Sequence, residues 1–304
     1  MSSFEERTTE ALGSAPSFFN KTEEKRQPVL LVLKGPNKGA TFPLNQPVHT
    51  LGRSAAMADI VLEGRGLSRA HAKIQLVEGA LVAVDLDSTN GVFVNGERIS
   101  DAKLKNGDVL GLGPEVTLRL ETPDESVREL LEDLYTGATK DGLTGVLNRK
   151  SFLQRLQEEY AATRRHAFDA SVALLDVDHF KSINDSYGHP AGDAVLVELA
   201  QRLQAGIRAE DVLGRYGGEE FIVLIRHSPL NGALILLERI RESIAGRPFV
   251  VPTSDGERAI TVTVSAGLCA VDSDRHWEFP IKKADEALYE AKSQGRNRVV
   301  LSTL

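Results

Sequence analysis

The sequence predicts a two-domain protein in which an all-β sandwich is followed by a sheet layered with helices. Three observations lead to this prediction. The 304 residues suffice for two domains that each bury a core. Residues 28–121 contain many short strand-like runs separated by Gly, Asn, Asp and Pro, which is typical of a sandwich. From residue 139 onward, strand patterns alternate with helix patterns at residues 193–207, 233–246 and 281–295, which indicates an α/β or α+β domain.

Composition and charge limit the possible ligands and compartments. No apolar run reaches the length of a membrane span, and the first ten residues lack the basic start and apolar middle of a signal peptide. The net charge of −7 argues against broad nucleic-acid binding, so a polyanionic ligand requires a local cluster of cations. With the single cysteine, Cys269, an internal disulfide is excluded. We expect a cytoplasmic protein without a membrane span or a nucleic-acid partner.

Two further segments precede and follow the predicted sandwich. Residues 1–27 are polar without a sustained period, which predicts a disordered tail that contains Thr8, Thr9 and Thr22. Residues 122–138 predict a linker helix with Pro and acids in its first turn and Gly137 at its end. One apolar stripe runs along this helix at Val127, Leu130, Leu131 and Leu134. Either a neighbouring domain or the same helix of a second chain can cover the stripe, and both alternatives remain open.

The stretch from Val212 to Arg226 predicts a hairpin of two apolar strands. Gly217 and Gly218 supply the bend and leave bare backbone there, and the acids Glu219 and Glu220 follow it. Taken alone, such acids are typical of a solvated hairpin tip. Another acid, Asp176, closes an apolar strand, and carboxylates that meet beside a hairpin can hold Mg²⁺ against substrate phosphates.

The loops of the first domain form a recognisable series. In order they contain Gly52-Arg53, Ser68-Arg69-Ala70-His71, Asp87-Ser88-Thr89-Asn90-Gly91 and Asn95-Gly96. This series resembles the forkhead-associated (FHA) domain over nearly its whole length. The resemblance implies that residues 28–121 bind a phosphothreonine peptide through Arg53, Ser68, Arg69, Thr89 and Asn90, while His71 braces the loops. Guanidinium, hydroxyl and amide donors suit phosphate oxygens.

Five motifs of the second domain occur in a fixed order. They are DGLTGVLNR from Asp141, the D-x-D-x-F-K-x-I-N-D run from Asp176, G-H-x-x-G-D from Gly188, GGEEF from Gly217 and ADEALYEAKSQGRN from Ala284. Residues 139–304 thereby resemble the GGDEF domain of diguanylate cyclases. The resemblance implies an α+β ferredoxin-like core similar to the palm of nucleotide cyclases, and the condensation of two GTP into cyclic di-GMP and pyrophosphate.

The resemblance also assigns roles residue by residue. It implies that the metal, Mg²⁺ or Mn²⁺, is held by Asp176, the Val177 carbonyl and Glu219, with Glu219, Glu220 and Asp176 as catalytic residues. Substrate contacts are implied for the guanine-reading pair Asn184 and Asp193, for Gly217 and Gly218, and for the phosphate-binding groups His179, Phe180, Lys181, Lys292 and Arg296. Lys292 and Arg296 are four apart, which predicts one helix face for both; by themselves they read as a surface charge pair.

Regulation follows from the same resemblances. Each domain of this family binds one GTP, so a homodimer with facing domains is implied. The Arg208-x-x-Asp211 string, with Arg239, matches a site where the product cyclic di-GMP inhibits the enzyme, although alone it reads as a surface ion pair. We expect the FHA-like domain to bind either the chain's own tail, phosphorylated at Thr8 or Thr9, or an external phosphoprotein. The alternative function is a catalytically silent receptor for cyclic di-GMP.

Overall fold

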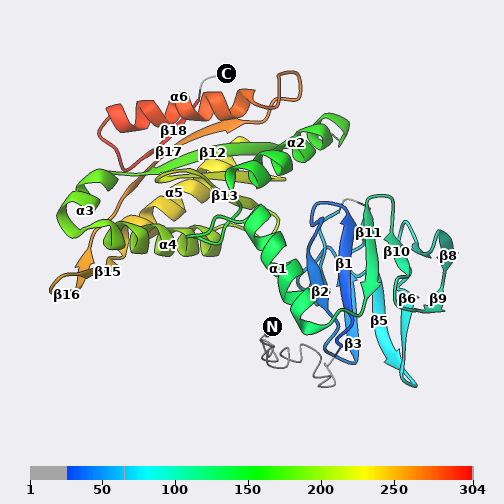
Figure 1. The fold of residues 1–304 in the computed structure, drawn as a ribbon. Coiled ribbons are helices and arrows are strands. Elements are labelled where there is room, and N and C mark those ends of the chain that lie inside the picture. The colour runs from blue at the N-terminus through cyan, green and yellow to red at the C-terminus, as the bar shows by residue number, and fades with distance from the viewer. Residues whose placement is uncertain (1–25, 65, 167, 303–304) are drawn as a thin grey trace, which may run out of the picture.

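The computed structural model describes residues 26–302, apart from residues 65 and 167. The candidate phosphorylation sites Thr8 and Thr9, like Thr22, lie outside the described residues. The chain forms two lobes joined by one helix (Figure 1). The predicted fold class, an all-β sandwich followed by an α+β domain, is confirmed. None of the described helices is both long enough and apolar enough to cross a membrane.

The N-terminal lobe packs two largely antiparallel sheets face to face. Apolar residues such as Leu30, Leu51, Ile74 and Leu110 fill the space between them and are at most 1% exposed. One sheet has the order β2-β1-β11-β10-β7-β8 and consists of β2 (Thr41–Pro43), β1 (Val29–Lys34), β11 (Val116–Glu121), β10 (Val109–Leu112), β7 (Val92–Val94) and β8 (Glu97–Ile99). The other sheet has the order β4-β3-β5-β6-β9, with β4 (Ile60–Val61), β3 (Val48–Gly52), β5 (Ala72–Val77), β6 (Ala80–Asp85) and β9 (Asp101–Lys103).

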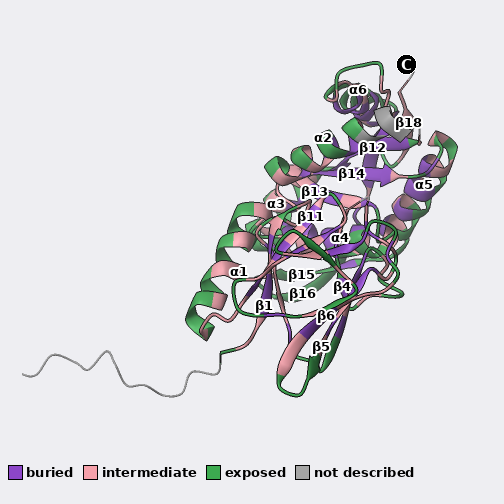
Figure 2. Cartoon of the chain, turned by 90° about the vertical axis from the view of Figure 1, so that its right-hand side faces the viewer, coloured by how far each residue is buried: buried purple, intermediate pink, exposed green. Residues whose placement is uncertain are grey.

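A single helix, α1 (Glu125–Thr139), connects the lobes. Asp124 caps it by accepting a hydrogen bond from the Val127 amide at 2.8 Å. Gly137 does not end the helix as predicted, because its backbone stays helical and the last turn closes when the Lys140 N–H donates to the Thr136 carbonyl. Tyr135 packs against the sandwich beside Gly39, whereas the outer face of α1 is uncovered (Figure 2).

The C-terminal lobe is a five-stranded sheet with helices on both faces. Its order is β13-β14-β12-β17-β18, formed by β13 (Val212–Gly217), β14 (Glu220–Arg226), β12 (Ala170–Val177), β17 (Val264–Ala270) and β18 (Val299–Leu301). A separate hairpin comprises β15 (Phe249–Thr253) and β16 (Gly256–Ile260). The helices are α2 (Arg149–His166), α3 (Phe180–Tyr187), α4 (His189–Gly206), α5 (Leu230–Gly246) and α6 (Phe279–Ser293). Helices α2 and α3 and the β15–β16 hairpin have no counterpart in the sequence prediction.

Alternating residues of β12 serve two separate cores. Ala173 and Leu175 belong to the core that also contains residues of α4 and α5, and Val172 and Leu174 belong to the one that contains residues of α2 and α6. All eight residues of β12 are buried, which explains the nearly continuous apolar run of this strand. The strand can therefore end in carboxylates at a fixed depth between two helical layers.

Candidate active site and ligand-binding loops

Two acids meet where β12 ends and β14 begins. In the antiparallel register, Asp176 is the direct partner of Glu220. Partners across a strand pair lie on the same face of the sheet. Glu219 is the next residue outward, in the turn that follows Gly218, whose φ of 49° suits glycine. The structure thus brings Asp176 next to Glu220, with Glu219 adjacent at the tip of the hairpin.

Burial and charge repulsion destabilise the charged forms of the Asp176 and Glu220 carboxylates. Asp176 is 6% exposed, and its pKa is raised by burial, although a salt bridge of 2.7 Å between Lys292 Nζ and Asp176 Oδ2 opposes the shift. Burial also raises the pKa of Glu220, and the neighbouring Asp176 raises it further. A cation at this strand end therefore stabilises both carboxylates, and the Lys292 ammonium already occupies one side.

The donor chemistry suits a divalent metal. Among the described residues, no three His, Cys, Asp or Glu side chains converge as a metal-binding group. The predicted set of Asp176, Glu219 and the Val177 carbonyl does not require three such side chains. Its donors are all oxygens, which Mg²⁺ prefers, and the repulsion between Asp176 and Glu220 favours a cation between them. The residues present therefore fit the implied metal.

Asp178, two residues after Asp176, has a structural role. Its carboxylate accepts hydrogen bonds from the hydroxyls of Thr263 and Ser265, both at 2.7 Å, and from the Asn297 amide at 3.0 Å. Asp178 is only 4% exposed. It ties the end of β12 to the approach to β17 and to the turn that follows α6, and so fixes the strand end on which Asp176 lies.

The start of α3 presents free backbone donors next to the acids. His179 caps this helix in a left-handed conformation with a φ of 57°, and it makes no side-chain cap bond. The first amides of a helix, here from Phe180 onward, have no acceptor inside the helix and are suited to bind an anion. Lys181 is exposed in the first turn. These groups are where the resemblance expects triphosphate contacts.

Helices α3 and α4 bring the predicted guanine-reading residues together. Gly188, with a φ of 85°, joins the two helices as their shared cap. The side-chain oxygen of Asn184 is buried without a hydrogen-bond partner, and a Cβ on Gly192 would lie 2.0 Å from it. A side chain at position 192 would displace the Asn184 amide, and Asp193 follows at the surface. A buried amide oxygen without a partner is rare in a folded protein and suits a ligand donor.

Arg296 does not share a helix face with Lys292, so that prediction is wrong. Helix α6 ends at Ser293, because Gly295 and Arg296 adopt φ values of 108° and 62°. The Arg296 amide then donates to the Ala291 carbonyl at 3.0 Å. Arg296 nevertheless remains close enough to lower the pKa of Asp176, against the larger effect of burial.

Arg215 braces the glycine turn and was missed as a functional residue. Its guanidinium donates to the Gly218 carbonyl at 2.7 and 2.9 Å and forms a salt bridge of 3.0 Å with Asp141, which follows α1 by two residues. Burial acts to raise the pKa of Asp141, but hydrogen bonds from Thr144 and Arg215 outweigh this effect and lower the pKa below its usual value. The available signal was an arginine two residues before the glycine turn together with an acid in the DGLTG string.

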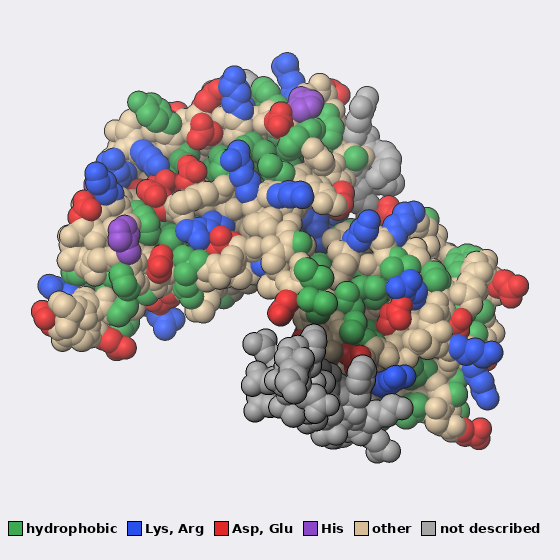
Figure 3. All heavy atoms as spheres, in the orientation of Figure 1, with side chains coloured by type: hydrophobic (Ala, Val, Ile, Leu, Met, Phe, Trp, Pro, Cys, Tyr) green, Lys and Arg blue, Asp and Glu red, His purple; other side chains and the backbone are tan. Residues whose placement is uncertain are grey.

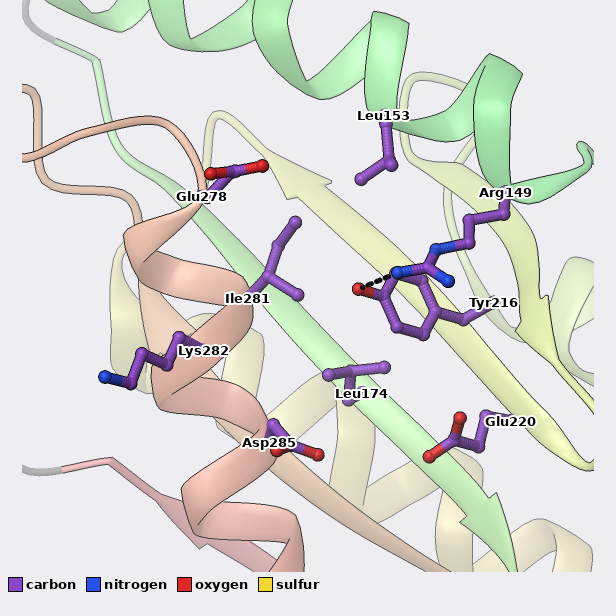
Figure 4. Close-up of a pocket in the computed structure, with 9 residues that line it drawn as sticks. All are labelled: Arg149, Leu153, Leu174, Tyr216, Glu220, Glu278, Ile281, Lys282 and Asp285. Carbon is purple, nitrogen blue, oxygen red and sulfur yellow. Dashed lines mark hydrogen bonds between the residues drawn. The ribbon is translucent and has the colours of Figure 1, made fainter.

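A cavity of about 330 Å³ opens on the α2 and α6 side of the sheet (Figure 4). Glu220 points toward it and is the one predicted site residue in its wall. Arg149 lies 4.3 Å from the ring centre of Tyr216 and donates to its hydroxyl at 3.1 Å. This contact ties α2 to the strand that leads into the glycine turn.

The predicted product site contains one structural acid and two available cations. Asp211 is buried and accepts hydrogen bonds from the backbone amides of Arg208 and Arg226, both at 3.0 Å. The Arg208 side chain is exposed, and Arg239 donates to the Gly206 carbonyl at 3.0 Å. The structure therefore places both arginines around the loop between α4 and β13, with Asp211 holding that loop in shape.

The five predicted phosphopeptide residues gather in loops at one end of the sandwich. Ser68 Oγ accepts from the Thr89 amide at 3.2 Å, and the Arg53 amide donates to the Ser68 carbonyl at 3.1 Å. Asn90 donates to the Gly66 carbonyl at 2.9 Å, and the side chains of Arg53 and Arg69 are exposed. Hydroxyl, amide and guanidinium donors are thereby presented on adjacent loops.

The family model described as "Diguanylate cyclase, GGDEF domain" matches residues 138–298, just over half of the chain. The chain belongs to the GGDEF diguanylate cyclase family. A second model, described as "Inner membrane component of T3SS, cytoplasmic domain", matches residues 31–124, which form the sandwich and the start of the linker.

Individual relatives match the GGDEF part. The chain is 41% identical to diguanylate cyclase DgcP of Pseudomonas aeruginosa over 180 residues and 42% identical to response regulator PleD of Caulobacter vibrioides over 175 residues. These matches cover 59% and 57% of the chain but only 26% and 38% of the two relatives. The coiled coil and GGDEF domain of DgcB from Caulobacter crescentus, solved with c-di-GMP, matches with a TM-score of 0.55 and 33% identity, over 59% of this chain and 93% of that one.

The buried contacts of His71 make the stability of the sandwich loops depend on pH. Its Nδ1 accepts from the Ser68 amide at 3.0 Å and its Nε2 lies 3.2 Å from the Gly91 carbonyl, an arrangement that needs a neutral ring with the proton on Nε2. Burial lowers the pKa of His71 below its usual 6.5. The unfolded chain therefore binds the extra proton more readily, and the free energy of unfolding falls as the pH drops below 6.5.

Thermal unfolding between pH 7.5 and 5.5 measures this effect. We expect the melting temperature of the wild type to fall toward acid pH and that of His71→Gln to change less, because glutamine does not titrate. Parallel pH profiles for the two proteins would contradict the assigned role.

Proposed function

We propose that the chain is an active diguanylate cyclase that condenses two GTP into cyclic di-GMP and pyrophosphate. The observation that supports it best is that buried Asp176 meets half-buried Glu220 and Lys292 near the start of α3. Membership of the GGDEF family and the likeness to DgcB solved with c-di-GMP give further support. In this proposal the chain has a phosphopeptide-binding domain, a linker and a cyclase domain, at residues 28–121, 122–138 and 139–304. The protein works in the cytoplasm, where its substrate GTP is found.

The residues divide the work of binding and transfer. Asn184 and Asp193 read the guanine edge, the α3 amides with Lys181, Lys292 and Arg296 hold the triphosphate, and Gly217 and Gly218 leave room for it. Bound Mg²⁺ or Mn²⁺, held by Asp176, Glu219 and the Val177 carbonyl, supplies positive charge at the transferring phosphate.

In each phosphoryl transfer, one bond to phosphorus forms and one breaks. The 3′-oxygen of one GTP forms a bond to the α-phosphorus of the other GTP, and the bond to pyrophosphate breaks. The proton of the 3′-hydroxyl passes to a carboxylate, for which Glu219 at the hairpin tip is the candidate and Glu220 the neighbour that tunes it. Two such transfers close the ring, and positioning of the two nucleotides provides much of the acceleration.

Two copies of the cyclase domain must face each other for this reaction. On α1, Val127, Leu130 and Leu134 are 43%, 56% and 61% exposed. They lie at i, i+3 and i+7, which is one face of the helix. The same helix of a second copy covers these side chains in our proposal. Because Asp141 follows α1 and pairs with Arg215, the pairing of helices also bears on the glycine turn.

Purified protein incubated with GTP and Mg²⁺ tests the cyclase proposal. We expect cyclic di-GMP at a rate per molecule that rises with protein concentration. Glu219→Gln and Asp176→Asn should reduce the rate by about 10²-fold or more, because charge stabilisation is lost at the reacting phosphate. Glu257→Gln, an exposed acid on β16, serves as the control. A folded dimer that makes no cyclic di-GMP would instead favour a silent receptor.

We also propose that the product inhibits the enzyme at Arg208 and Arg239, with Asp211 shaping the loop. Cyclic di-GMP carries two phosphates, and exposed guanidinium groups bind phosphate through charge-assisted hydrogen bonds. Arg208→Ala should raise the product concentration needed for half inhibition by about tenfold. Inhibition curves with added cyclic di-GMP measure it, and an unchanged curve would remove this site.

For the sandwich we propose phosphothreonine recognition by Arg53, Ser68, Arg69, Thr89 and Asn90. The ligand is the chain's own tail phosphorylated at Thr8 or Thr9, which gains from a high effective concentration, or an external phosphoprotein. A synthetic peptide of residues 1–20 phosphorylated at Thr8 or Thr9 should bind, and its unphosphorylated form should not. Arg53→Ala should weaken binding by about tenfold or more. If deletion of residues 1–20 changes neither turnover nor localisation, the tail is not the ligand.

A further inference from the structure

One ion pair joins the two lobes directly. Arg155 of α2 donates to Glu63 of the sandwich through both guanidinium ends, with Nη1–Oε2 at 2.5 Å and Nη2–Oε1 at 3.2 Å. The Arg155 side chain is 14% exposed and that of Glu63 is 40% exposed. Paired guanidinium and carboxylate groups with two hydrogen bonds are more specific than ordinary surface pairs. The contact therefore links the sandwich directly to α2.

On the sandwich side, this ion pair adjoins the proposed ligand loops. Glu63 precedes Ser68 by five residues, and its amide donates to Asn37 Oδ1 at 2.9 Å. Between Glu63 and Ser68, the Gly66 carbonyl accepts from the side-chain amide of Asn90 at 2.9 Å. A residue proposed to contact the phosphopeptide thus also holds the backbone that leads to the ion pair.

On the cyclase side, Arg155 belongs to a helix fixed to the catalytic hairpin. Phe152, one turn earlier, is fully buried, and it packs so closely on Gly214 of β13 that a Cβ there would lie 2.9 Å from the Phe152 Cβ. One turn later, Glu159 forms a salt bridge of 2.9 Å with Arg226 at the end of β14. Both strands that lead to and from the glycine turn are therefore tied to α2.

We propose that Glu63 and Arg155 form a latch that opens when the sandwich binds its phosphopeptide. Ligand that engages Asn90 competes with the Gly66 carbonyl for the Asn90 side-chain amide. This competition frees the backbone at Gly66, three residues after Glu63, and loosens the pair of Glu63 with Arg155. When the ion pair breaks, the sandwich can change its position on α2, and this movement transmits ligand binding to the catalytic hairpin. This inference rests on the proposed phosphothreonine recognition.

Reciprocity makes the latch testable by binding alone. If ligand binding opens the latch, then breaking the latch in advance must tighten ligand binding by the same free energy. Simple electrostatics predicts the opposite for Arg155→Gln, since the loss of a cation weakens attraction for an anionic peptide. The sign of the change for this one variant separates the two explanations.

The experiment is calorimetric titration of the full chain with the phosphorylated peptide of residues 1–20, in parallel with its unphosphorylated form. We expect Arg155→Gln to bind about fivefold more tightly than wild type, and the exchange of charges in Glu63→Arg with Arg155→Glu to restore wild-type affinity. Lys150→Gln removes an exposed cation from the same helix and should not tighten binding. Melting temperatures confirm that each variant is folded.

The outcomes separate the two proposals. Unchanged or weaker binding by Arg155→Gln, while wild type binds the phosphorylated peptide, would overturn the latch and leave phosphothreonine recognition standing. Absence of binding by every variant, wild type included, would overturn recognition of this peptide and the latch with it.

Discussion

The antiparallel register of β12 and β14 pairs Asp176 with Glu220, and the surrounding contacts of the C-terminal lobe hold these two acids close enough to repel each other. The buried length of β12 fixes the depth of Asp176, and Asp178 holds the strand end through three hydrogen bonds. Lys292 neutralises part of the charge. A polyanionic nucleotide requires further cations at such an edge, and the free α3 amides and exposed Lys181 lie there. On the face shown in Figure 3, acidic and basic side chains are interspersed.

A second constraint is the shape of the glycine turn. Arg215 donates to the Gly218 carbonyl and forms a salt bridge with Asp141, two residues after α1. Arg149 reaches Tyr216 from α2, and Phe152 packs on Gly214. The hairpin that presents Glu219 and Glu220 is therefore held by both segments that connect to the sandwich, α1 and α2. Regulation through either segment needs no contact between a ligand of the sandwich and the acids themselves.

Much of this arrangement was predictable, because glycine turns, strand-terminal acids and alternating patterns leave local signals. The approach of Asp176 to the hairpin and the two-domain fold class were predicted from them. Helix α2 was missed since its outer face is highly charged, although Phe152 and Leu156 are fully buried. The predicted helix face shared by Lys292 and Arg296 was wrong because residue spacing cannot show where a helix ends. The pair of Glu63 and Arg155 joins residues 92 apart, and no local pattern announces such a contact.

The central claim is that Asp176 and the hairpin acids together hold a divalent cation beneath a nucleotide's phosphates. Electron paramagnetic resonance of Mn²⁺, titrated into the full chain with a non-reactive GTP analogue, tests it most directly. The account predicts that wild type binds Mn²⁺ with the analogue and that Asp176→Asn binds it at least about tenfold more weakly. Equal Mn²⁺ affinity in the two proteins would contradict the account.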